Sequence, residues 1–102
     1  MSYAIRYRGE AEAEIENAFL WLEKQQKGLG IRFVAELETL DATIAENPYV
    51  FQVVEPPDVR RGLFRRFPFS LFYRIRPDAV DVLACLHQHQ DPRSREELIS
   101  RS

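Results

Sequence analysis

Residues 60–87 constrain the fold of this chain most, because two prolines divide the segment into short runs that read as consecutive β-strands. Pro68 and Pro77 lie in the gaps, and connections this short favour an antiparallel meander. A further apolar run at 51–54 is expected to be extended before two more prolines interrupt it. The three main strands are expected at roughly 59–65, 69–76 and 80–87.

Side-chain alternation predicts which face of each strand is buried, because successive residues point to opposite faces. In the middle strand the predicted core face carries Phe69, Leu71, Tyr73 and Ile75. The face predicted to look outward carries Ser70, Phe72, Arg74 and Arg76. In the last strand the predicted core face carries Val80, Val82, Ala84 and Leu86. The opposite face is left with Asp81, Leu83, Cys85 and His87.

The first half of the chain has a helical period instead. After a short expected strand at 3–7, apolar residues recur at three- and four-residue steps in two stretches, which Gly28 separates and Pro48 closes. The first stripe consists of Ala11, Ile15, Ala18, Phe19 and Leu22. The second consists of Leu29, Phe33, Leu37, Leu40 and Ile44. Two helices joined this closely should form an antiparallel hairpin.

The predicted fold class is therefore α+β, with the order β-α-α-β-β-β. The helix hairpin should pack on one face of a mostly antiparallel sheet, and residues 93–102 should form a short tail or helix. With 102 residues, we expect one domain over 1–102. No segment approaches the roughly 18 consecutive apolar residues of a membrane span. The N-terminus has no signal-peptide pattern, and Cys85 is the single cysteine, so a cytoplasmic protein is expected.

Positive charge gathers in the second half of the chain. Residues 1–50 carry five basic and nine acidic side chains, whereas residues 51–102 carry nine basic and seven acidic ones, which gives a net charge of −2. An acidic protein gains little long-range attraction to nucleic acid, so an acidic protein partner is an equally good interpretation. Alternatively, Arg60 and Arg61 could pair with Glu55 and Asp58, or the arginines could form an ordinary solvated face.

Three local patterns could carry chemistry, although an ordinary structural role is favoured for each. His87 and Asp81 share a predicted face, but His87 is expected to be a hydrogen-bonding residue at a strand end. Cys85 beside His87 could form a nucleophile pair, yet a small buried hydrophobe is the expected role of the cysteine. His87, His89 and Asp91 are a weak metal pattern, so we expect neither a metal nor a cofactor.

An ordered set of short motifs resembles the RelE/ParE superfamily of type II toxin-antitoxin toxins, and the ParE side in particular. The resemblance covers residues 3–95, nearly the whole chain. Its motifs are Ala11 and Ile15, Gly28-Leu29-Gly30 before Phe33, Asn47-Pro48, Arg60-Arg61, Arg66-Phe67-Pro68-Phe69, Phe72-Tyr73, and His87 followed by Asp91-Pro92.

The resemblance implies a cytoplasmic bacterial toxin that a cognate antitoxin holds inactive in a hetero-oligomer, in a system of the plasmid-stabilisation type. ParE-like members are associated with inhibition of DNA gyrase, whereas RelE-like members are ribosome-dependent mRNA endoribonucleases. Phe69 and Ser70 stand where the ribonucleases commonly have an arginine, and Gln88 replaces a tyrosine after His87. Both departures favour ParE. Gln90 replaces an arginine frequent in ParE-like chains, which leaves an inactive interaction module as a further alternative.

These implications give three expected sets of site residues. The target-binding set is Arg60, Arg61, Arg65, Arg66, Arg74, Arg76, Arg93 and Arg95. The antitoxin-binding set is Leu20, Trp21 and Phe72. A ribonuclease would depend on Arg74, Arg76 and His87.

Overall fold

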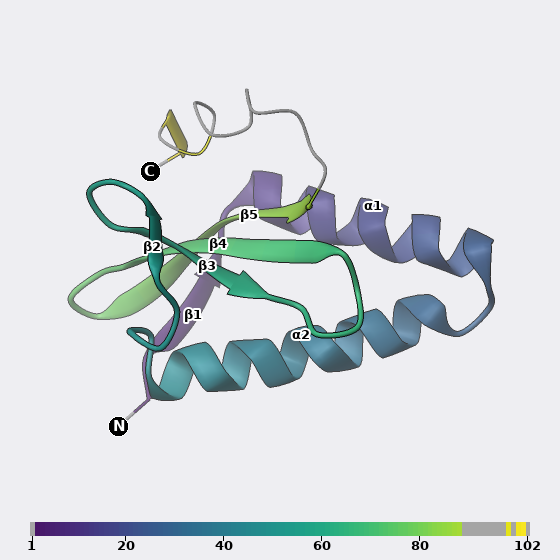
Figure 1. The fold of residues 1–102 in the computed structure, drawn as a ribbon, viewed down its shortest axis with the longest axis horizontal. Helices are drawn as coiled ribbons and strands as arrows, with labels where there is room; N and C mark the ends of the chain where they lie inside the picture. Colours follow the sequence, from purple (N-terminus) through teal and green to yellow (C-terminus); the bar gives the residue numbers. More distant parts are fainter. Residues whose placement is uncertain (1, 89–97, 99, 102) are drawn as a thin grey trace.

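A computed structural model describes residues 2–88, 98, 100 and 101, and it confirms the predicted α+β architecture (Figure 1). Two helices are followed by four strands, and one further strand precedes them. The elements are β1 (Ala4–Tyr7), α1 (Gly9–Gln25), α2 (Leu29–Glu46), β2 (Val53–Glu55), β3 (Val59–Leu63), β4 (Phe69–Ile75) and β5 (Ala79–His87). The tail helix expected near the C-terminus lies largely outside the described residues.

The strands form one five-stranded sheet in the order β1-β5-β4-β3-β2. Strands β2 to β5 pair antiparallel with their neighbours, which confirms the meander, while β1 pairs parallel to β5. Parallel pairing requires a long connection rather than a tight turn, and the helix hairpin between β1 and the meander provides one. No helix in the described part of the chain has the length and hydropathy of a membrane span.

The turn between the helices depends on two residues. Gly28 has φ of 95°, a left-handed conformation that glycine adopts without the steric cost of a Cβ atom. The α2 N-terminus has no side-chain cap of its own, but the Glu23 carboxylate of α1 accepts hydrogen bonds from the backbone N–H groups of Gly28 (3.1 Å) and Gly30 (2.8 Å). Glu23 thus satisfies two donors that a helix start leaves unpaired and fixes the hairpin.

The main core lies between the hairpin and the sheet, and Phe33 of α2 is at its centre. Its ring stacks on Phe64 with centroids 4.9 Å apart and meets Phe69 and Phe67 edge-on at 5.3 and 5.6 Å. Leu71 and Tyr73 of β4 belong to the same cluster. The predicted core face of β4 is therefore confirmed.

A β-bulge makes the prediction for β5 wrong beyond Leu83. Tyr73 pairs with Val82, but the next residue of β4, Phe72, pairs with Ala84, so Leu83 is an extra residue. An extra residue reverses the alternation that follows it. Val80, Val82 and Cys85 consequently join the helix-side core, whereas the opposite face carries Leu83, Ala84 and Leu86.

The sheet face away from the hairpin holds a second apolar cluster. It consists of Val59, Leu83, Ala84, Leu86 and Leu98, with Phe72 packed against it. Ser70 is also buried, so the prediction that this face of β4 looks outward is wrong for Ser70 and Phe72. The reason is that Leu98, which is 1% exposed, returns to cover the sheet. Arg101 then forms an ion pair with Glu14 of α1 at 3.1 Å and donates to the Leu83 carbonyl.

Helices α1 and α2 are in close contact at Gly30. A Cβ atom there would lie 2.7 Å from Cδ2 of Phe19 and 2.8 Å from Cγ of Glu23. Glu23 cannot withdraw without losing its hydrogen bonds to the start of α2. Gly30→Ala should therefore lower the free energy of unfolding by about 1–3 kcal/mol, as measured by urea denaturation. Gly9→Ala is the control, because nothing lies within 4 Å of its Cβ position. Equal stability of the two variants would contradict the tight packing.

Candidate functional site

The predicted arginine set divides into side chains that the fold itself uses and side chains that face solvent. Arg60 belongs to the first group. Its Nη1 donates to the Phe51 carbonyl at 2.5 Å, and its guanidinium lies 5.1 Å from the centroid of the Tyr49 ring. Arg60 thus anchors the segment that leads into β2.

Arg74 and Arg76 also have partners within the chain, on the sheet face away from the hairpin. Nε of Arg74 lies 2.8 Å from Asp58, and Nε of Arg76 lies 3.1 Å from Asp81, which also binds Arg6 at 3.0 Å. Partial burial alone would raise the pKa of Asp81, but the hydrogen bonds from Arg76 and Arg6 outweigh it and lower that pKa below its usual value. These arginines form a structural ion-pair network.

Arg65 and Arg66 are different, because they stand exposed in the loop between β3 and β4. Their backbone N–H groups donate to the Glu36 carboxylate of α2, at 2.8 Å from Arg65 and 3.1 Å from Arg66. Arg32, one turn before Glu36, joins them around a depression of about 460 Å³. Arg61 is half-buried on β3, and Arg93 and Arg95 lie outside the described residues.

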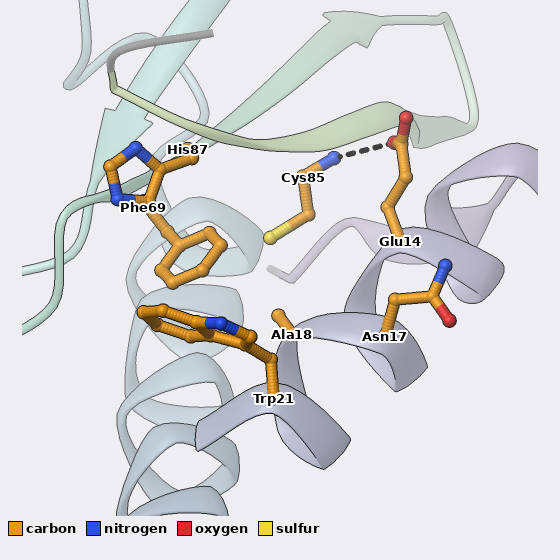
Figure 2. Close-up of a pocket in the computed structure, with 7 residues that line it drawn as sticks. All are labelled: Glu14, Asn17, Ala18, Trp21, Phe69, Cys85 and His87. Atoms are coloured by element: carbon orange, nitrogen blue, oxygen red, sulfur yellow. Dashed lines mark hydrogen bonds between the residues drawn. The ribbon is translucent and has the colours of Figure 1, made fainter. Parts of the chain in front are cut away.

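His87 lines a separate pocket between α1 and the end of β5, with a volume of about 300 Å³. Figure 2 shows the rings of Trp21 and Phe69 directed into the same space, and His87 meets Phe69 edge-on at 5.3 Å. The remaining lining residues are Glu14, Asn17, Ala18 and Cys85. The pocket is mostly aromatic and apolar, so its geometry suits an apolar or aromatic side chain.

The histidine patterns do not assemble into a reactive group among the described residues. Asp81 precedes the bulge and lies on the opposite face of the sheet from His87, so their expected common face is wrong. Burial raises the pKa of the Cys85 thiol to about 12, and the nearby Glu14 charge adds to the shift. A thiol with that pKa is protonated at neutral pH and is a poor nucleophile.

Of the weak metal pattern His87, His89 and Asp91, the last two residues lie outside the described residues. Within the described part of the chain, no three His, Cys, Asp or Glu side chains are grouped as metal ligands.

The predicted antitoxin-binding residues differ in how exposed they are. Leu20 and Trp21 of α1 are 51% and 50% exposed, which is high for large apolar side chains and leaves them accessible to a partner. Phe72 lies instead in the second apolar cluster, packed among the side chains that Leu98 covers.

Sequence reasoning missed Arg32 and Glu36. Both lie in the first half of a predicted helix, 29 or more residues before the loop that they meet, and no local pattern connects the two segments. The available signal is weak: Glu36 follows the buried Phe33 by three residues, which places its carboxylate near the core side of the helix.

Two solved structures share this fold. A chain from the chromosomal ParDE toxin-antitoxin system of P. aeruginosa aligns with a TM-score of 0.74 and 16% identity, covering 84% of this chain and 96% of that one. A mutant of the E. coli toxin RelE in the free state aligns with a TM-score of 0.72 and 16% identity, covering 99% of this chain and 98% of that one. Comparison with curated proteins gave no match.

The fold is therefore the one shared by the RelE and ParE toxins. Residues 5–92 match the family described as the ParE toxin of the type II toxin-antitoxin system parDE. The match spans most of the chain, so the protein belongs to the ParE toxin family. This confirms the resemblance that the sequence motifs indicate.

The ion-pair network gives a prediction with a definite pH dependence. The pKa of Asp81 is lower in the folded protein than in the unfolded chain, so its stabilising contribution is present above the unfolded value of about 4 and disappears as the pH falls through the folded value. Asp81→Asn should be less stable than the wild type at neutral pH, and the difference should vanish in acid, as measured by urea midpoints across pH.

Asp78→Asn is the matched control, because Asp78 is 77% exposed and reaches Arg6 only at 3.9 Å. We expect this variant to follow the wild type at every pH. A stability difference for Asp81→Asn that persists below its folded pKa would contradict the ion-pair explanation.

Proposed function

We propose that this chain is a single-domain, ParE-like cytoplasmic toxin that binds and inhibits DNA gyrase, and that a cognate antitoxin neutralises it in a hetero-oligomeric complex. Membership of the ParE family supports the toxin role. The likeness to a chain of a ParDE toxin-antitoxin system supports an antitoxin partner.

One observation favours gyrase binding over ribonuclease chemistry. A ribonuclease needs a base, an acid and cations that converge on one phosphate. The three residues available for this, Arg74, Arg76 and His87, do not share a face of the sheet: the arginines pair with Asp58 and Asp81 on one side, and His87 lines the pocket beside α1 on the other. The arrangement supports a toxin that acts by binding.

The antitoxin is proposed to cover Leu20 and Trp21. Trp21 lines the aromatic pocket (Figure 2), and the exposed Leu20 is its neighbour on α1, so an apolar segment of a partner could bury both side chains. Large aromatic residues next to a pocket are typical centres of binding energy. Phe72 is partly buried against the second apolar cluster, so it offers a partner less surface than Leu20 or Trp21.

The gyrase proposal predicts that the purified protein inhibits supercoiling of relaxed plasmid by gyrase, and that added antitoxin restores supercoiling. In parallel, messenger RNA in a translating extract should remain intact. Normal supercoiling at a large molar excess of the protein would contradict the proposal. Cleavage of ribosome-bound messenger RNA would identify a ribonuclease instead, and harmless expression with neither effect would identify an inactive interaction module.

Because the antitoxin is proposed to cover Leu20 and Trp21, Trp21→Ala should weaken antitoxin binding by about 30-fold, the loss typical of a central aromatic contact. Titration calorimetry measures this change in affinity. Val50→Ala is the control, since Val50 is similarly exposed but lies in the segment before β2. Unchanged urea midpoints would show that both variants are folded. Equal antitoxin affinities for the two variants would contradict this placement of the surface.

A further inference from the structure

The loop between β3 and β4 and the first half of α2 together present three exposed arginines around one depression. Arg65 and Arg66 come from the loop, and Arg32 comes from the helix. Leu29 and Phe67 supply apolar lining to the same depression. We call this surface the loop-arginine surface.

Glu36 determines where the loop lies. Each oxygen of its carboxylate accepts a backbone N–H of the loop, with Oε2 2.8 Å from the Arg65 nitrogen and Oε1 3.1 Å from the Arg66 nitrogen. The carboxylate therefore holds the loop backbone against α2, while Arg65 and Arg66 line the depression and are exposed to solvent. Three guanidinium groups and one carboxylate leave a local charge of about +2, on a chain whose net charge is −2.

The loop is also held at both ends by aromatic packing. Phe64 precedes the two arginines and stacks on Phe33, and Phe67 follows them and meets the same ring edge-on. Arg65 and Arg66 thus sit between two anchored phenylalanines, and the loop backbone does not need to be ordered when a partner binds. Such preorganisation lowers the entropic cost of association.

The three arginines of this surface differ from Arg60, Arg74 and Arg76 in being uncommitted. Arg60, Arg74 and Arg76 bind acceptors within the chain. Within the described residues, the side chains of Arg32, Arg65 and Arg66 form no ion pair. Cations that the fold does not use, fixed on a preorganised backbone, are suited to recognising an anionic partner.

We propose that the loop-arginine surface binds an acidic segment of the toxin's target protein. This inference rests on the proposed function and names the chemistry of the target contact. The apolar lining from Leu29 and Phe67 fits a peptide that carries apolar side chains among its carboxylates better than it fits a phosphate backbone. The Glu36 carboxylate amid the arginines and the acidic net charge of the chain both disfavour a polyanion such as DNA.

The first test measures binding to a defined probe, a fluorescein-labelled peptide of alternating glutamate and leucine, by fluorescence anisotropy. The double variant R65Q/R66Q should weaken peptide binding by about tenfold, and R32Q should weaken it by a smaller factor. The double variant R8Q/K24Q is the matched control, because it also removes two exposed positive charges but lies outside the surface. It should bind the peptide as the wild type does.

Three outcomes of this test would overturn the proposal. One is peptide binding that R65Q/R66Q leaves unchanged, and another is an equal loss in R8Q/K24Q, which would show a general charge effect. The third is tighter binding of labelled duplex DNA than of the peptide, with the same sensitivity to R65Q/R66Q, which would make the surface a nucleic-acid site.

The second test uses the full protein with gyrase and with the antitoxin. R65Q/R66Q should inhibit supercoiling about tenfold less well than the wild type, while its affinity for the antitoxin changes by less than about twofold. Loss of antitoxin binding with unchanged gyrase inhibition would assign the surface to the antitoxin and overturn the proposal. If the wild type itself does not inhibit gyrase, the proposed function fails, and the peptide measurements still decide whether the surface binds acidic segments.

Discussion

The packing around Phe33 is the interaction on which the other features depend. One buried ring on α2 contacts Phe64 directly after β3, Phe69 at the start of β4 and Phe67 in the loop between the two strands. Aromatic pairs of this kind contribute about 0.5–1.5 kcal/mol each beyond the burial of their area. Because the contacts lie on both sides of the loop, the same packing that joins the hairpin to the sheet also orients Arg65 and Arg66.

Much of the fold follows from the sequence, because periodicity and breakers act locally. The apolar steps before Pro48 predict both helices, and the prolines after it predict the meander. The bulge at Leu83 has no such signal. Residues 82–86 are all apolar, so either phase of alternation leaves an apolar side chain on each face, and only the pairing with β4 selects one.

The candidate sites were less predictable, since their geometry depends on contacts between distant residues. The arginines of 60–76 look equivalent in sequence, yet Arg74 is paired by Asp58, sixteen residues away, while the loop of Arg65 is held by Glu36, twenty-nine residues away. Only the tertiary arrangement distinguishes cations that hold the sheet together from cations that remain available. Exposure of Leu20 and Trp21 was easier to anticipate, because both lie off the apolar stripe of their helix.

The bulge in β5 has a consequence for how members of one fold can diverge. The side chain of His87 points towards α1 only because the chain carries one residue more than regular pairing requires. If the same sequence paired with β4 without the bulge, every residue after Val82 would shift by one position and His87 would turn to the face that carries Arg74 and Arg76. A histidine and two arginines would then share one surface without any change of residue type. In this fold, the pairing register of the last strand can therefore determine which groups meet, independently of which groups are present.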